Sequence, residues 1–416
     1  MEMKYCNNIP IKIIKDPKFK NILINFVFLT PFTKSTATHY SLLRGVLATS
    51  CKKYNTNEKM HQITGKLYGS YVSINNRYSY KTRITTIYLK MPNPKYIPDE
   101  NIMDEALDFL YEIIFRPNAS NKKFDQKLFE KEKRMLHNCI LSSFNNKKSL
   151  ALDNMLNHMC KDDVINIKSM GTIEDLDVMT SESLYDVYLD LLNNSKKIIY
   201  VQGDVDDSIC DKLQKFNKIE SQDIDLEYKM IENIEVQEEK EIIEEANINQ
   251  SSLILGYRTT INNYDKRVDA FNVFKTMLGD MTSSTLHQVV REKHNLCYSI
   301  YARAFINYKI FVIRAGIDKK NYEKTVKLIK EEIENYRNGK FDENLINMAK
   351  IDIINVYKSI NDFLGDIINL EINKDMLEKD DNIEDIINKI NSVTKEDIIN
   401  VAKDIKLDTI YMLANE

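Results

Sequence analysis

The residues in this sequence that are best suited to a functional site are an arginine and a tyrosine seven positions apart. The run VVREK (289–293) is typical of a helix end and carries Arg291, and the strand expected to begin at Leu296 carries Tyr298. Both side chains donate hydrogen bonds, so together they could hold a carbonyl oxygen or the oxyanion formed from it. The residues alone leave a second interpretation open, in which Arg291 pairs with a surface carboxylate and Tyr298 is half-buried.

The histidines do not form a zinc motif. A zinc-binding helix carries two histidines four residues apart with a glutamate between them, and no two of the six histidines have this spacing. The pairs His137/Cys139 and His158/Cys160 lie in helical sequence, where residues two apart point in nearly opposite directions. We therefore do not expect either pair to hold a metal ion.

Other catalytic patterns are also missing. The sequence contains no GxSxG, GxGxxG or GxxxxGK[ST], which removes the usual signals for a serine hydrolase and for phosphate-binding loops. Cys297 lies in a strand-like run among apolar residues, and we interpret it as a buried structural thiol rather than a nucleophile.

The elements that would position Arg291 and Tyr298 follow one pattern that occurs twice along the chain. Apolar and β-branched runs predict strands at 22–30, 196–204, 251–259, 296–305, 308–317 and 408–414, and a hairpin over 70–92 that turns at Asn75 and Asn76. Helical periodicity predicts helices at 38–55, 57–68, 101–115, 124–160, after the N-cap candidate Thr180, at 266–279 and 283–293, and onward to about 405.

A direct internal similarity supports a duplication. Residues 172–201 resemble residues 382–413, so that Thr180 corresponds to Thr394 and Tyr200 to Tyr411. A period above 200 residues is too long for a solenoid and predicts two tandem copies of one α+β domain.

The expected boundaries follow from the same pattern. We expect an N-terminal domain at 1–217, a linker at 218–248 that contains the acidic run EVQEEKEIIEE, and a C-terminal domain at 249–416.

Composition and charge restrict the class of protein. The chain has 416 residues, 58 Lys plus Arg and 62 Asp plus Glu, giving a net charge of −4, which argues against a strongly basic nucleic-acid binder. The mean hydropathy of −0.40 argues against an integral membrane protein. Six scattered cysteines without a CxxC pair, and a start that does not read as a signal peptide, predict a cytoplasmic protein without nucleic-acid or membrane partners.

The stretch 251–317 resembles the second domain of the insulinase and mitochondrial processing peptidase family of zinc metallopeptidases, the inverzincins. The matching residues are Leu278, Gly279, the run 290–293, Leu296, Tyr298 and the run 315–317. The resemblance extends over essentially the whole chain. It implies an α+β fold of two tandem homologous domains, each a mostly antiparallel sheet packed with helices, in the metallopeptidase-like LuxS/processing-peptidase architecture, with such halves enclosing a peptide chamber.

The zinc motif of the family is degenerate here. Family peptidases bind zinc through an HxxEH helix and a distal glutamate, and these positions fall on Ser41, Arg44, Gly45 and Cys139. Only an acidic neighbour of the distal ligand is matched, by Glu132. The resemblance therefore implies no metal and no cofactor in this chain, because all three zinc ligands and the general base are replaced.

The substrate-binding pair of the family is matched at the expected spacing by Arg291 and Tyr298. The closest resemblance is to the zinc-less YfmF-like group, which is associated with elongation-factor-P modification and whose members accompany an active homologue. The mitochondrial non-catalytic subunit fits less well, because the run LGDMTSS (278–284) has a single glycine where that subunit has a glycine-rich loop.

The resemblance thus implies a bacterial, catalytically silent subunit. It would form a heterodimer with an active zinc-bearing homologue, enclose a peptide and supply Arg291 and Tyr298 to a zinc metalloendopeptidase complex. Three alternatives stay open: a scaffold or peptide-binding protein, a partner subunit in leader-peptide removal, and an active peptidase with an unrecognised metal site.

Overall fold

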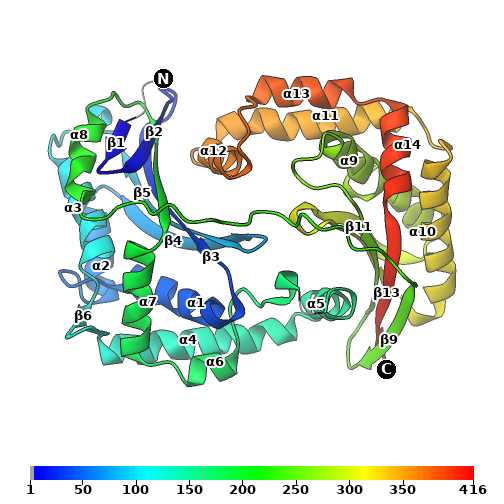
Figure 1. Ribbon diagram of the computed structural model, residues 1–416, viewed down its shortest axis with the longest axis horizontal. Coiled ribbons are helices and arrows are strands. Elements are labelled where there is room, and N and C mark those ends of the chain that lie inside the picture. The colour runs from blue at the N-terminus through cyan, green and yellow to red at the C-terminus, as the bar shows by residue number, and fades with distance from the viewer. Residues whose placement is uncertain (1–3, 162) are drawn as a thin grey trace. The chain divides into compact units, whose positions relative to one another are not determined.

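The computed structural model describes residues 4–161 and 163–416 and divides the chain into two compact units (Figure 1). The first unit contains the residues up to Ser142, Ile167–Glu227 and Phe363–Ile372. The second unit contains Ser143–Asn166, Tyr228–Asp362 and Asn373–Glu416. Each unit has its own sheet packed with helices, which confirms the expected α+β class with two similar domains.

The first unit is built on a six-stranded sheet. Its strands are β1 (Lys4–Cys6), β2 (Ile9–Lys15), β3 (Asn21–Pro31), β4 (Tyr71–Ser79), β5 (Thr82–Pro92) and β8 (Lys196–Gly203), with the short pair β6 (Ala119–Ser120) and β7 (Lys123–Phe124) outside the sheet. Its helices are α1 (Lys34–Thr49), α2 (Asn57–Lys66), α3 (Ile102–Phe115), α4 (Gln126–Asn145, whose last turn lies beyond the division after Ser142), α6 (Ile173–Asp177), α7 (Ser181–Asn193) and α8 (Ile209–Leu213).

The second unit is built on a five-stranded sheet. Its strands are β9 (Lys240–Ala246), β10 (Ser251–Arg258), β11 (Cys297–Phe305), β12 (Ile310–Ile317) and β13 (Lys406–Asn415). Its helices are α5 (Lys147–Met159), α9 (Val268–Lys275), α10 (Tyr322–Arg337), α11 (Asn344–Ser359), α13 (Ile383–Ser392) and α14 (Lys395–Asp404), and α12 (Asp366–Leu377) crosses the division between the units. No helix in the described part of the chain is both long enough and apolar enough to span a bilayer.

The two sheets share one topology. The first has the order β1-β2-β8-β3-β5-β4 and the second the order β11-β12-β10-β13-β9. In both, one long central strand lies between two antiparallel neighbours, and a single parallel pair, β2 with β8 or β9 with β13, stands next to it. When the second sheet is read in reverse order, its strands correspond one by one to those of the first sheet: β9 to β2, β13 to β8, β10 to β3, β12 to β5 and β11 to β4.

The predicted duplication is confirmed at its two marker residues. Thr180 and Thr394 both cap a helix, and in each case the threonine accepts a hydrogen bond from the backbone three residues on while that third side chain bonds back. Each capped helix then leads into the strand that carries the corresponding tyrosine, Tyr200 in β8 and Tyr411 in β13.

The second sheet is covered on both faces. Alternate residues of β10 point to opposite sides, so Leu253, Leu255 and Tyr257 join the main core with the helices that follow in sequence, while Ile254 joins a smaller core with α5. Gly256 permits this close approach of α5, since a Cβ there would lie 2.8 Å from the sulfur of Met159.

Two domain boundaries differ from the expected ones. Residues 143–166 were expected in the first domain but pack in the second unit, because the apolar face of α5 covers the sheet of that unit. The acidic segment expected as a linker contains β9, whose residues 240–246 pair in parallel with 409–415 of β13.

The predicted hairpin over residues 70–92 forms, but its turn lies elsewhere. Asn75 and Asn76 are inside β4, and the chain turns at Tyr80 and Lys81 with Tyr80 in the left-handed conformation at φ 52°. Asn76 does not turn the chain because its side-chain amide is used in packing: Nδ2 donates to the Tyr40 carbonyl on α1 over 3.0 Å.

Candidate functional site

Arg291 lies in a stretch of π-helix, His287–Lys293. Turns of π-helix are rare and occur frequently at functional sites. The stretch ends where Asn295 adopts the left-handed conformation at φ 49°, which asparagine tolerates better than most residues. This lets the Leu296 N–H bond the Val290 carbonyl over 3.0 Å and the Asn295 N–H bond the Arg291 carbonyl over 2.9 Å. The chain therefore passes directly from the arginine into β11.

Tyr298 lies at a β-bulge on the edge strand of the second sheet. Cys297 pairs with Ile317 and Ser299 pairs with the adjacent Gly316, so Tyr298 has no partner residue on β12. β-Bulges of this kind change the direction of a side chain and are common beside active sites. The result is a tyrosine with 78% of its surface exposed, not the half-buried side chain of the alternative interpretation.

Arg291 and Tyr298 line the same cavity, which has a volume of about 530 Å³. The guanidinium carbon of Arg291 lies 6.0 Å from the centroid of the Tyr298 ring, at the outer limit of a cation–π contact. Gln250, Asn295 and Asp318 add polar groups to the wall. Two hydrogen-bond donors thus face one concave surface, as their spacing in the sequence suggested.

His287, which the sequence suggested only as a partly exposed polar residue on one helical face with His294, is a neighbour of Arg291. Nε2 of His287 lies 2.6 Å from Nη1 of Arg291, and Oε1 of Glu292 lies 3.5 Å from Nε of Arg291. A guanidinium only donates, so His287 accepts with Nε2 and carries its proton on Nδ1. The spacing of four residues was the available signal, because such side chains lie on one face of a helix. Arg291 is thereby oriented and still 40% exposed.

Cys297, next to this pair, is a buried thiol as expected. Burial raises its pKa to about 11, and the positive charge of Arg291 opposes this only in part. At neutral pH the sulfur therefore carries its proton and is a poor nucleophile.

The degenerate zinc-motif positions lie on α1 of the first unit. The Ser41 hydroxyl donates to the Ser169 carbonyl over 2.9 Å, and Arg44 is exposed. Gly45 faces α4, since a Cβ at this position would lie 3.0 Å from Oε2 of Glu132. Position 45 therefore lies against the acidic residue Glu132.

Glu132 on α4 is a buried carboxylate used in packing. Only 6% of its surface is exposed, and Oε1 lies 3.1 Å from the hydroxyl of Thr49 and 3.4 Å from Nζ of Lys131. The Thr49 hydroxyl also donates to the Gly45 carbonyl over 2.7 Å. These contacts join α1 to α4 through the side chains of Glu132 and Thr49.

The residues at these positions do not fit zinc. Zinc in proteins takes thiolate, imidazole and carboxylate ligands, and the three ligand positions hold a hydroxyl, a glycine and the exposed thiol of Cys139. Over residues 4–161 and 163–416, no group of three or more His, Cys, Asp or Glu is arranged to hold a metal ion.

His158 and Cys160, the second His/Cys pair of the sequence, also make structural contacts. Nε2 of His158 lies 2.9 Å from Oε1 of Glu244, and Cys160 is a buried thiol whose pKa burial raises to about 12.

Known proteins with similar sequences point to one family. The family described as Peptidase M16 inactive domain matches residues 179–352. A probable inactive metalloprotease of Bacillus subtilis (strain 168), YmfF, is 31% identical over 99% of this chain and 98% of its own length.

Solved structures agree. A conserved protein from Enterococcus faecalis V583 superposes with a TM-score of 0.93 at 27% identity, over 100% of this chain and 98% of the other. A peptidase M16 inactive domain from Pseudomonas fluorescens superposes with a TM-score of 0.80 at 14% identity, over 100% and 98%, which shows a shared fold. The 31% identical relative spans nearly the whole chain and the family model is matched, so the chain belongs to the M16 metallopeptidase family, as a homologue whose zinc-motif positions hold no zinc ligand set.

Proposed function

We propose that this chain is the zinc-less subunit of a two-subunit peptidase and pairs with an active, zinc-bearing homologue. The observation that carries the proposal is the contrast within the chain. The motif positions on α1 and α4 hold no zinc ligand set, whereas Arg291 and Tyr298 lie exposed over one cavity.

The proposed role of the pair is to hold the peptide. The Arg291 guanidinium and the Tyr298 hydroxyl donate hydrogen bonds to a peptide carbonyl, and these bonds strengthen as negative charge develops on that oxygen during hydrolysis. Chemistry at the metal belongs to the partner. The contact with His287 fixes the arginine before substrate arrives, which reduces the entropy lost on binding.

A scaffold role is the second candidate, and one observation favours it. Arg291 already has an imidazole and a carboxylate within reach, so it has internal partners even without a peptide. In that case Arg291 and Tyr298 contribute nothing to turnover.

The proposal is tested by purifying the tagged full-length chain from its native host and identifying the co-purifying proteins by mass spectrometry. We expect a stoichiometric homologue that carries HxxEH, with zinc and peptidase activity in the complex and neither in the isolated chain. A chain that purifies alone or as a homodimer contradicts the pairing, and stoichiometric zinc with activity in the isolated chain contradicts the silent role.

A further inference from the structure

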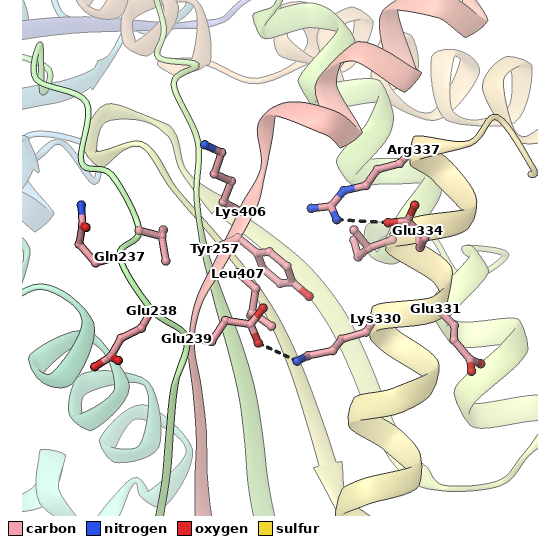
Figure 2. A pocket seen from close by; sticks show the side chains of 12 residues that line it. Gln237, Glu238, Glu239, Tyr257, Lys330, Glu331, Glu334, Arg337, Lys406 and Leu407 are labelled. Atoms are coloured by element: carbon pink, nitrogen blue, oxygen red, sulfur yellow. Dashed lines mark hydrogen bonds and ion pairs between the residues drawn. The ribbon is translucent and has the colours of Figure 1, made fainter.

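A second cavity of the second unit, about 630 Å³ in volume, shares no lining residue with that of Arg291 and Tyr298. Figure 2 shows it between α10, the ends of β10 and β13, and the segment 236–239. β9 begins to pair with β13 only at Lys240, opposite Thr409, so Lys406 and Leu407 have no partner on β9. The chain before β9 stays away from the sheet, and the cavity lies in the resulting space.

Tyr257 supplies a buried hydroxyl to this cavity. Only 2% of its surface is exposed, and its hydroxyl has no hydrogen-bond partner among the described residues. In Figure 2 the hydroxyl points toward α10. Burial and the nearby Glu239 raise its pKa, with Arg337 acting in the opposite direction, so the hydroxyl is a neutral donor at physiological pH. A buried donor without an acceptor is costly, and this one faces a space large enough for a ligand.

Two ion pairs line the space in front of this hydroxyl. Nζ of Lys330 lies 2.8 Å from Oε2 of Glu239, which joins α10 to the segment before β9. Nη1 of Arg337 lies 3.3 Å from Oε2 of Glu334, and its other nitrogens donate to two backbone carbonyls at the end of α14. Arg337 is therefore fixed, whereas the Lys330–Glu239 pair can part by rotation of two long side chains.

We propose that this cavity binds a small zwitterion with one ammonium and one carboxylate group, an α-amino acid or a dipeptide. The ligand carboxylate accepts the hydrogen bond of Tyr257 and replaces Glu239 beside Lys330. The ligand ammonium then pairs with the displaced Glu239 carboxylate. Every charge keeps an opposite partner, and the hydroxyl gains the acceptor that it lacks.

Charge balance distinguishes this ligand from simpler ions. Lys330 and Glu239 are partly exposed, so the difference is one of repulsion: a simple anion beside Lys330 would also meet the negative charge of Glu239, and a simple cation beside Glu239 would meet the positive charge of Lys330. The lining as a whole contains both signs: the basic residues are Lys330, Arg337 and Lys406, and the acidic residues are Glu238, Glu239, Glu331 and Glu334. Val236, Ile333 and Leu407 complete the wall and favour an apolar side chain on the ligand.

Calorimetric titration of the isolated full-length chain tests the proposal independently of any partner protein. The probes are L-leucine and glycyl-L-leucine, with isovalerate as the carboxylate-only control and isoamylamine as the ammonium-only control. We expect one of the two zwitterions to bind saturably, one per chain, with a Kd at least about tenfold below that of either single-charge control. Absence of saturable binding of both zwitterions in the millimolar range, or equal affinity for a single-charge control, overturns the proposal.

Tyr257→Phe provides the matched variant, because it removes the hydroxyl and keeps the ring. We expect it to weaken binding of the zwitterion by about tenfold and to raise the Tm of the ligand-free chain, since a buried hydroxyl without a partner is removed. Tyr301→Phe, on the exposed side of β11, should leave the affinity unchanged. Unchanged affinity in Tyr257→Phe, or a lowered Tm without ligand, contradicts the assignment of the hydroxyl to the ligand.

Discussion

The two repeats differ in how their candidate sites use polar groups. In the first unit, Glu132 is buried against α1 and bonds Thr49. In the second unit, Tyr298 lies on a bulged edge strand and Arg291 beside it is well exposed over a cavity. In one repeat, the polar group of the site, Glu132, is satisfied by hydrogen bonds within the protein. In the other repeat, the donors Arg291 and Tyr298 remain accessible to a partner or a substrate. Function is inferred from that difference in partners, because the fold is common to both.

The reactivity of two cysteines gives the largest expected contrast between the sites. Cys139 occupies a degenerate ligand position and is exposed, whereas Cys297 is buried with a pKa raised to about 11 from the ordinary 9.0. The alkylating species is the thiolate, so the raised pKa alone slows Cys297 by about a hundredfold at pH 8.

The measurement is iodoacetamide labelling of the native chain, followed by peptide mass spectrometry across a pH series. Labelling of Cys297 should increase about tenfold per pH unit up to about pH 11, because more of the thiol ionises. Equal labelling of Cys139 and Cys297 at pH 8 would contradict the closed environment of the latter.

Removal of the buried carboxylate should destabilise the first unit. Glu132→Ala deletes one of the two acceptors within reach of the Thr49 hydroxyl and leaves a space between α1 and α4, which should cost about 1–3 kcal/mol of unfolding free energy. Glu132→Gln retains the volume and an acceptor and should cost less. Urea denaturation measures both, and a neutral Glu132→Ala would show that the carboxylate has no structural role.

The paired helix caps should respond alike if the two units are true repeats. Thr180→Ala and Thr394→Ala each remove one N-terminal hydrogen bond and should each cost about 1 kcal/mol. Thr→Ser at either position keeps the hydroxyl and serves as the control. Unequal urea midpoints for the two alanine variants would show that the repeats have diverged in how they hold these helices.

Substitutions of Arg291 and Tyr298 should have the smallest effect, because they should hardly change the stability of the chain. Arg291→Ala and Tyr298→Ala in the isolated chain should each change the unfolding free energy by less than about 0.5 kcal/mol, because Tyr298 is 78% exposed and the partly exposed Arg291 contributes only surface contacts. A loss comparable to that of Glu132→Ala would make them structural residues.

Much of the fold could be predicted from the sequence because local and tertiary preferences agree. The run 22–30 is apolar except for Asn25 and Thr30, and it lies in β3, the central strand that is buried on both faces. Thr180 and Thr394 are corresponding residues in the sequence, and each is the N-cap of a helix. The strands that follow these helices occupy equivalent places in the two sheets.

The errors arise where distant contacts override local signals. Asn76 has turn-forming chemistry, but its amide bonds α1 and Thr85, so the turn moves to Tyr80. Helix α5 follows α4 directly along the chain and still packs in the other unit, which no local pattern reveals.

The candidate site was predictable in its residues but not in its construction. Arg291 and Tyr298 stand at a spacing that suggested convergence. The π-helical stretch that carries the arginine and the bulge that exposes the tyrosine depend on backbone hydrogen bonds without a sequence signature. His287 stands four residues before Arg291 in the sequence, and the structure adds the contact between its Nε2 and the guanidinium.

The central claim, that a zinc-less chain supplies substrate contacts to an active partner, is tested most directly by Arg291→Ala in the assembled pair. Arg303→Ala is the matched control, because Arg303 is an exposed arginine on β11, the strand that also carries Tyr298. The account predicts that Arg291→Ala lowers kcat/KM for a peptide by about 10²–10³-fold while pairing and zinc content stay intact, and that Arg303→Ala changes neither. Full turnover by an intact Arg291→Ala pair would contradict the account and leave the chain a scaffold.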